Sequence, residues 1–317
     1  MTSVLRSTLL ACAESAWLRE RATRYRFIRR SVSRFMPGER FEDALAAAHT
    51  IGGDGAASTF THLGENVTSG DEADAVARHY LDVLDRLSLS SIDAQVSVKL
   101  TQLGLDLGVD ACYRRLRRLV HRSAEIGTVV WIDMESTGYV DQTLAIYRRI
   151  RDESRAVGVC LQAYLRRTAA DLAELLPLGP AIRLVKGAYR EPDDLILPRK
   201  RDVDENFFRL AVQLLSGGAR RQTAFLAVGT HDQALIDRIG TYTAKQSVPH
   251  DRYEFAMLYG IRTGLQRQLV ASGGRVRVLI SYGDSWFPWY MRRLAERPAN
   301  MLFVAKSLLG EGRPGKR

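Results

Sequence analysis

Charged side chains alternate with apolar residues in two short segments of this 317-residue chain. Lys99 follows Ser97 at a spacing of two, and Glu135 follows Asp133 at the same spacing. Residues spaced by two lie on one face of a β-strand. If neighbouring strands carry the two segments, Lys99 is expected to pair with one of the carboxylates. A structural ion pair and a catalytic role explain such a pair equally well.

A third segment places two cations in an apolar run. Arg183 and Lys186 are separated by Leu184 and Val185, and Gly187 and Ala188 follow. A glycine allows a ligand to approach the backbone closely. The combination suits an anionic or electron-rich ligand, such as a flavin with its pyrophosphate.

A fourth set of residues lies near the end of the sequence. Trp289, Arg292, Arg293 and Glu296 are spaced by three, four and seven positions, so all four share one face of a helix. Adjacent arginines can hold a carboxylate through paired hydrogen bonds, and Glu296 can orient the guanidinium one turn before it. The alternative is an ordinary solvated stripe of arginine and glutamate.

The elements that must position these residues repeat along the chain. Short apolar runs alternate with amphipathic segments of helical length, which is typical of βα units with a parallel sheet. The predicted strands span residues 58–63, 95–100, 129–135, 158–163, 181–187, 224–228, 253–258 and 276–282. Eight such units without a glycine-rich nucleotide fingerprint predict an α/β fold, a (βα)8 TIM barrel.

The predicted barrel spans residues 57–317, and residues 1–56 are expected to form an N-terminal helical extension interrupted at Pro37-Gly38. In such barrels the chemistry lies at the C-terminal ends of the strands. That rule brings Lys99, Asp133 and Lys186 to one face of the molecule.

The composition of the chain limits its cellular location and the partners that it can bind. The three cysteines lack the spacing of a zinc site, and an odd number does not suggest a disulfide framework, so no metal is expected. No signal peptide or apolar stretch of membrane-spanning length is evident, which predicts a cytoplasmic protein. The net charge of +10 attracts nucleic acid or anionic lipid. No nucleic-acid-binding motif accompanies it, so solvated arginine-rich helix faces are the preferred explanation and no nucleic-acid partner is expected.

Seven motifs resemble, in order, the successive motifs of the proline dehydrogenase family. They are Val98-Lys99-Leu100, Ile132-Asp133-Met134-Glu135, Gln162-Ala163-Tyr164, Arg183-Leu184-Val185-Lys186-Gly187-Ala188-Tyr189, Gly229-Thr230-His231-Asp232, Phe255-Ala256-Met257-Leu258-Tyr259-Gly260 and Arg292-Arg293-Leu294-Ala295-Glu296-Arg297. The similarity extends from about Phe41 through Leu309 and includes Thr61-His62-Leu63-Gly64-Glu65-Asn66 in the first strand. Chance does not explain seven motifs in the family's order.

The resemblance implies a non-covalent FAD at the C-terminal end of the barrel. Arg183 would approach the flavin N5, and Thr230 and His231 would lie near the pyrophosphate or the adenosine, with a helix cap as the alternative role for these two. The residues that the resemblance implies in cofactor binding are Met134, Gln162, Arg183, Lys186, Gly187, Ala188, Tyr189, Thr230 and His231.

The resemblance also implies a small cyclic amino acid with a free carboxylate as substrate. Lys99, Arg292 and Arg293 would hold that carboxylate, and Asp133 and Glu296 would orient the cations. Leu258, Leu279 and Trp289 would line the pocket, while Asp133 and Arg183 would take part in catalysis. The expected reaction is oxidation of the ring C–N bond to a pyrroline-type imine by hydride transfer to the flavin.

Two positions depart from the family pattern. The eighth strand has Leu279 where the family usually has tyrosine, with Ser281 in place of a proline, and Trp289 stands where tyrosine is usual in the last helix. The departures are either neutral drift in an enzyme for L-proline or the mark of a biosynthetic relative acting on a substituted or homologous cyclic amino acid. The intact arginine pair favours a free carboxylate in either case.

Other function classes compete with this interpretation. An aldolase-like barrel would use Lys99 or Lys186 to form a Schiff base. A cofactor-free protein would use its basic surface to bind nucleic acid or anionic lipid. For the dehydrogenase, the resemblance implies a quinone as the electron acceptor, which would suit a basic protein peripheral to the inner membrane.

Overall fold

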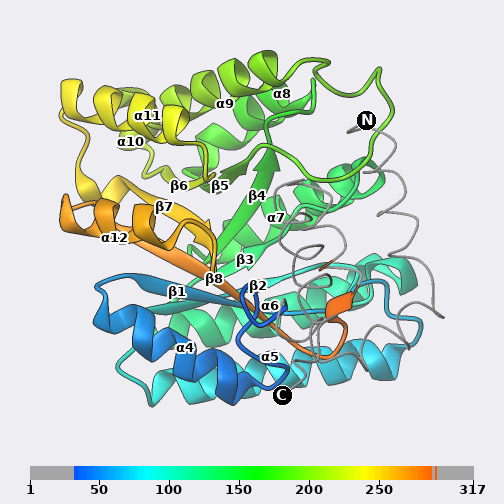
Figure 1. The fold of residues 1–317 in the computed structure, drawn as a ribbon. Helices are drawn as coiled ribbons and strands as arrows, with labels where there is room; N and C mark the ends of the chain where they lie inside the picture. Colours follow the sequence, from blue (N-terminus) through cyan, green and yellow to red (C-terminus); the bar gives the residue numbers. More distant parts are fainter. Residues whose placement is uncertain (1–31, 288–289, 291–317) are drawn as a thin grey trace, which may run out of the picture.

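Eight parallel strands close into a barrel in the computed structural model, which describes residues 32–287 and Tyr290 (Figure 1). The strands are β1 (Ala57–His62), β2 (Ala94–Val98), β3 (Val130–Ile132), β4 (Val157–Gln162), β5 (Ala181–Val185), β6 (Phe225–Gly229), β7 (Tyr253–Leu258) and β8 (Val276–Tyr282). Each strand pairs with the next, and β8 pairs with β1 from Ala57 beside Arg277 to His62 beside Tyr282. The prediction of a closed (βα)8 barrel is confirmed.

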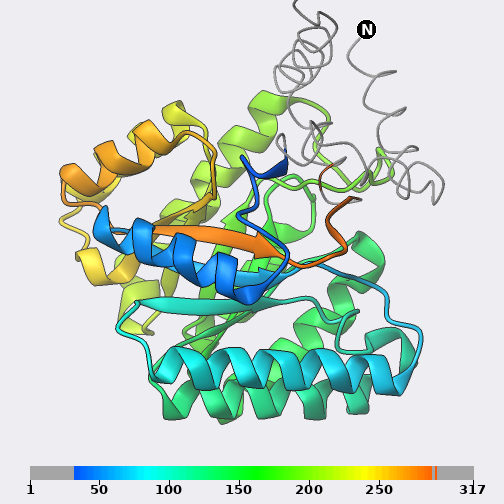
Figure 2. The ribbon, with the colours of Figure 1, turned by 60° about the horizontal axis from the view of Figure 1, so that its bottom comes forward.

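Helices surround the barrel, as the two views in Figures 1 and 2 show. The α-helices are α4 (Phe41–Gly53), α5 (Gly70–Ser88), α6 (Val109–Glu125), α7 (Val140–Glu153), α8 (Thr168–Leu175), α9 (Lys200–Leu214), α10 (Gly217–Arg221), α11 (Gln233–Lys245) and α12 (Thr263–Ala271). Short 3-10 helices are η1 (Leu105–Leu107), η2 (Thr137–Tyr139), η3 (Leu176–Leu178) and η4 (His250–Arg252).

Local chemistry explains where the longest of these helices begins. The Ser69 hydroxyl accepts a hydrogen bond from the Glu72 backbone N–H, and Asp71 and Glu72 add negative charge in the first turn of α5. Both features stabilise a helix N-terminus. The buried face of α5, which includes Tyr80 and Leu84, packs into the apolar layer around the barrel.

The N-terminal part of the described chain packs on the strands that close the barrel. Helix α4 lies along β8 (Figure 2), and its Phe41 ring contacts the rings of Phe60 and Tyr282, with centroid distances of 5.1 and 5.6 Å. Residues 1–31 of the predicted extension lie outside the described residues, so the division of the chain near residue 56 stays a prediction.

Three strands end two or three residues earlier than the sequence predicts. β2 stops at Val98, β3 at Ile132 and β5 at Val185. The Asp133 N–H still donates to the Val98 carbonyl at 2.8 Å. Beyond this bond the pairing of β2 with β3 ends, and the Thr101 N–H binds the Glu135 carboxylate at 3.1 Å.

The interior of the barrel is densely filled at β3 and β4. The Trp131 indole donates to the Gln95 side chain at 2.6 Å, and Gly158 is the register partner of Trp131 on β4. A Cβ at Gly158 would lie 2.5 Å from the indole ring, so only glycine fits beside Trp131.

A buried ionic network fills the end of the barrel at which the strands begin. Arg277 donates to both oxygens of Glu254 at 2.9 and 3.0 Å, and it also contacts Asp93 and the Ser58 carbonyl. The side chains of Arg277 and Glu254 are only 4% and 2% exposed. The network satisfies charges that would be costly to bury alone.

Surface arginines on α6 and α7 have acidic partners. Arg117 pairs with Glu153 at 2.5 Å, and Arg149 pairs with Asp110 at 3.1 Å.

No helix within residues 32–287 combines the length and the apolar character needed to cross a membrane.

Candidate active site

The predicted site residues that the structure describes gather at one end of the barrel. Because all eight strands are parallel, their C-terminal ends form a single rim. The residues at or near this rim are Lys99, Asp133, Met134, Gln162, Arg183, Lys186, Gly187, Ala188, Tyr189, Thr230, His231, Leu258 and Leu279. Trp289, Arg292, Arg293 and Glu296 lie outside the described residues, so their roles stay predictions.

Arg183 is the cation that lies deepest in the rim. Its Nη2 contacts the Asp133 carboxylate and donates to the Ser97 hydroxyl at 2.7 Å, while that hydroxyl lies 2.9 Å from the same carboxylate. The guanidinium carbon lies 5.2 Å from the centre of the Trp131 ring, within the range of a cation–π contact. Burial opposes the charge of Arg183, but Asp133 and Cys160 outweigh it, so the pKa of Arg183 is raised.

Lys99 does not pair with Asp133 or Glu135, so that sequence-based prediction is wrong. Its ammonium donates to the Gly64 carbonyl at 3.2 Å and lies 3.8 Å from the Glu65 carboxylate. Strand alternation gives the face on which a side chain lies, but it does not give the neighbour that the side chain reaches. Arg183 therefore takes the place beside Asp133 that was expected for Lys99.

Glu135 has a structural position instead. Its carboxylate accepts from the Thr101 hydroxyl at 2.6 Å and from the Thr101 N–H at 3.1 Å. Burial raises the pKa of Glu135, although both Thr101 hydrogen bonds oppose the shift. The carboxylate thereby fixes the loop that carries Met134.

Gln162 contributes an acceptor that has no partner among the described residues. Its Nε2 donates to the Glu135 carbonyl at 3.2 Å, and the Met134 carbonyl lies 3.5 Å away. Those two carbonyls can only accept, which fixes the orientation of the amide. Its Oε1 is buried and unpaired in this part of the chain, a costly arrangement unless a ligand supplies a donor.

The turn after β5 is shaped by a packing contact. Gly187 has a φ of +116°, and a Cβ there would lie 2.2 Å from the Tyr164 ring. Lys186, Ala188 and Tyr189 beside it are half-buried. Any larger residue at 187 would displace Tyr164, so the turn requires glycine on both backbone and packing grounds.

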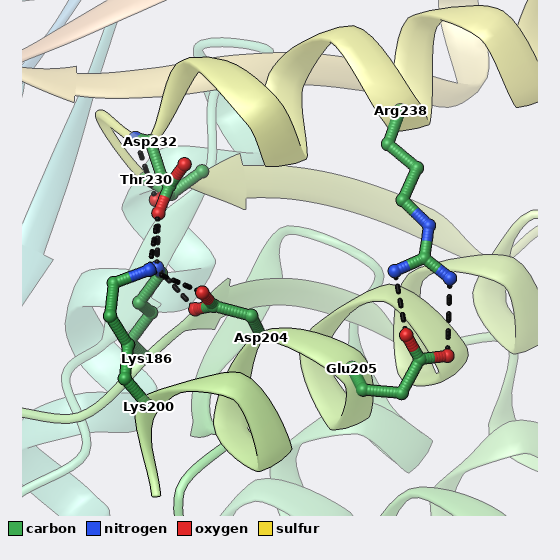
Figure 3. A network of polar contacts seen from close by, with 7 residues as sticks. All are labelled: Lys186, Lys200, Asp204, Glu205, Thr230, Asp232 and Arg238. Atoms are coloured by element: carbon green, nitrogen blue, oxygen red, sulfur yellow. Dashed lines mark hydrogen bonds and ion pairs between the residues drawn. The ribbon is translucent and has the colours of Figure 1, made fainter.

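Lys186 belongs to a closed set of ion pairs with Lys200, Asp204 and Asp232, which we name the charge ring (Figure 3). Lys186 lies 2.5 Å from Asp204 and 2.7 Å from Asp232. Lys200 contacts Asp204 and lies 3.0 Å from Asp232. Burial alone would raise the pKa of Asp232, but hydrogen bonds from the two lysines outweigh it and hold the pKa below its usual range.

Thr230 and His231 connect the ends of two strands. The Thr230 hydroxyl accepts from the Asp232 N–H at 3.1 Å, and the His231 Nε2 accepts from the Leu258 N–H at 2.9 Å. The residue that precedes α11 is Asp232, and no side chain caps the helix there. The alternative role of Thr230 and His231 as a helix cap is therefore wrong.

Leu258 and Leu279 form an apolar pair on adjacent strands. They are register partners in the pairing of β7 with β8, and both are half-buried. Leu279 offers Asp133 no hydroxyl, and the Asp133 carboxylate accepts a hydrogen bond from the Ser97 hydroxyl at 2.9 Å.

The sequence analysis assigned no function to several residues of the rim. Ser97 and Trp131 contact Arg183 across the barrel, which no local pattern reveals. The spacing of Lys200 and Asp204 by four predicts a helical ion pair. The contact of Asp204 with Lys186 depends on how α9 packs beside β5.

Comparison with known proteins shows the family to which the chain is related. The family model described as proline dehydrogenase matches residues 44–306. Proline dehydrogenase 1 of Bacillus subtilis subsp. natto is 37% identical over 307 residues, covering 96% of this chain and 99% of that protein. A proline dehydrogenase of Deinococcus radiodurans is 38% identical over 283 residues, covering 88% of this chain and 90% of its own length.

Solved structures show the same fold. Proline utilization A (PutA) from Bdellovibrio bacteriovorus, inactivated by N-propargylglycine, superposes with a TM-score of 0.78 at 23% identity. The match covers 85% of this chain and 33% of that larger protein. At this identity the likeness supports the barrel architecture alone.

Proposed function

The chain belongs to the proline dehydrogenase family, and we propose that it oxidises the ring C–N bond of L-proline or a closely related cyclic amino acid with FAD as cofactor. It is an oxidoreductase of a family that depends on FAD. The observation that carries the proposal is the buried cluster of Arg183, Asp133 and Ser97 at the mouth of the barrel, together with the unpaired Gln162 acceptor at the end of β4.

The described residues fit a flavin. Gln162 Oε1 needs a donor, and an isoalloxazine ring carries an N–H at its pyrimidine end. Arg183 supplies positive charge, which favours the reduced, anionic form of a flavin, and Lys186 supplies a hydrogen-bond donor. The residues proposed to hold FAD are Met134, Gln162, Arg183, Lys186, Gly187, Ala188, Tyr189, Thr230 and His231.

The proposed reaction removes a hydride from the ring carbon and a proton from the ring nitrogen, leaving a C=N bond. When bound, FAD supplies the hydride acceptor at N5. Lys99, Arg292 and Arg293 hold the substrate carboxylate, with Glu296 orienting the arginines, so that the reacting C–H has a fixed position. Asp133 acts by positioning Arg183, because these two side chains are in contact. A quinone at a membrane surface is the proposed final electron acceptor.

We predict that FAD copurifies with the full chain, because the buried Gln162 acceptor needs a hydrogen-bond donor. Mass spectrometry of the cofactor released by heat is the measurement. A colourless protein from cells supplied with riboflavin, or one that releases a nicotinamide, would contradict the proposal. A colourless protein that binds nucleic acid or anionic vesicles would favour the binding-protein alternative.

The Leu258–Leu279 pair leads to a prediction about the substrate. An apolar wall without the usual tyrosine hydroxyl leaves room for a substituent, so we expect a substituted or homologous cyclic amino acid to reduce the flavin faster than L-proline. The measurement is anaerobic bleaching of the visible flavin band by L-proline, ring-substituted prolines, pipecolate and pyrroline carboxylates. A 1 Å displacement of the ring can cost about 10²-fold in rate. If L-proline bleaches the flavin fastest, Leu279 and Trp289 are neutral drift.

A further inference from the structure

The charge ring joins three elements at one side of the rim (Figure 3). Lys186 follows β5, Lys200 and Asp204 belong to α9, and Asp232 precedes α11. Each lysine contacts both aspartates, so the two positive and two negative charges balance within the ring.

Lys186 is the more buried of the two lysines in the charge ring. An ammonium group has three N–H donors, and Asp204 and Asp232 each accept one from Lys186, which leaves one donor for a ligand. The Lys200 side chain is 73% exposed, against 26% for Lys186. Lys200 therefore contributes charge to the ring from the solvent side.

We propose that the charge ring sets the reduction potential of the bound flavin, with Asp204 and Lys200 as positioning residues that act through Lys186. The inference rests on the proposed function, because it requires FAD beside Lys186. With the ring intact, Lys186 presents a hydrogen-bond donor whose charge is balanced. Loss of one aspartate charge leaves the ring positive, and loss of Lys200 leaves it negative.

These two changes have opposite consequences. A positive excess stabilises the reduced, anionic flavin, and a negative excess destabilises it. Asp204 is 22% exposed and Lys200 is 73% exposed, so solvent screens the lysine more strongly. Removal of the Asp204 charge is therefore expected to have the larger effect.

The neighbouring residue on α9 supplies a matched control. Glu205 receives two hydrogen bonds from Arg238 of α11, at 2.7 and 3.1 Å. Figure 3 shows this pair apart from the ring although it joins the same two helices. Glu205→Gln removes the same charge as Asp204→Asn and loosens the same helix contact, but it leaves Lys186 untouched.

The experiment measures the equilibrium between each FAD-loaded variant and a reference dye under anaerobic conditions. We expect Asp204→Asn to shift this equilibrium toward reduced flavin by about three- to tenfold, where tenfold is about 30 mV for a two-electron couple. Lys200→Met should shift it in the opposite direction by about two- to fivefold. Glu205→Gln should stay within about twofold of the wild type.

The double variant Lys200→Met with Asp204→Asn distinguishes charge from structure. If charge is the cause, the double variant returns to within about twofold of the wild type, since the remaining pair is again neutral. Single variants that shift in the same direction, a double variant worse than either one, or an equal shift in Glu205→Gln would each overturn the inference. Wild-type protein without FAD would defeat the proposed function as well, whereas FAD with misdirected shifts would defeat the inference alone.

Discussion

The Arg183→Met variant is expected to lose about 10²- to 10³-fold in kcat, the cost of removing one preorganised charge from an active site. Arg183 is buried, contacts Asp133 and donates to Ser97. Methionine keeps the unbranched apolar stem of the side chain but leaves Asp133 with the Ser97 hydroxyl and no countercharge. The unpaired negative charge then opposes formation of a reduced, anionic flavin. Steady-state kinetics at matched FAD content is the measurement.

A double variant distinguishes the effect of losing the Arg183 charge from the effect of leaving the Asp133 carboxylate without a countercharge. Adding Asp133→Asn to Arg183→Met removes the uncompensated charge, so part of the lost rate should return. Arg183→Lys keeps the charge without the planar fork and should fall between the wild type and Arg183→Met. Wild-type kcat in the Arg183→Met protein would place the electrostatic role elsewhere in the rim.

Arg277→Met is expected to lower the free energy of unfolding by about 3–5 kcal/mol, the cost of breaking a buried ion pair from one side. The loss has a clear origin, because Glu254 is 2% exposed and accepts two hydrogen bonds from Arg277. Urea unfolding followed by tryptophan fluorescence measures it.

The matched control is Arg267→Met. Arg267 pairs with Asp54 at 3.0 Å, but the two side chains are 67% and 46% exposed, so the expected loss is below about 1 kcal/mol. Replacing Glu254 as well as Arg277 by apolar residues should cost less than replacing Arg277 alone, because no charge is then left unpaired. Equal losses of unfolding free energy in Arg277→Met and Arg267→Met would contradict the claim that burial of the ion pair determines the loss.

The fold could be predicted because each strand is a short apolar run with its own local pattern. In β5, Ile182 and Leu184 are buried in the layer around the barrel while Arg183 points to its interior, as period-two alternation requires. The strand ends could not be predicted to the residue. Beyond Asp133, the hydrogen bonds between Thr101 and Glu135 connect residues from two different loops, and such contacts have no local signal in the sequence.

The site could be predicted as a set of residues at one rim, because parallel topology alone brings the strand ends together. The partners within the set could not, because they depend on distances across the barrel. Asp133 reaches Arg183 instead of Lys99, and Lys186 meets Asp204 of α9 and Asp232, the residue before α11. Side-chain reach between strands that are not neighbours has no signal in a single sequence.

The network around Arg277 also has a consequence for synthesis of the protein. Arg277 donates to the carbonyl of Ser58, 219 positions earlier in the chain, and to Glu254, 23 positions earlier. On the ribosome, which adds about 5–20 residues per second, seven strands emerge before the arginine that neutralises Glu254. Until then the first strand lacks one of its two neighbours, β8, and the Glu254 carboxylate, which is buried in the finished fold, stays hydrated. A nascent chain arrested before residue 277 should therefore be open to proteases, with protection appearing only after β8 has left the exit tunnel.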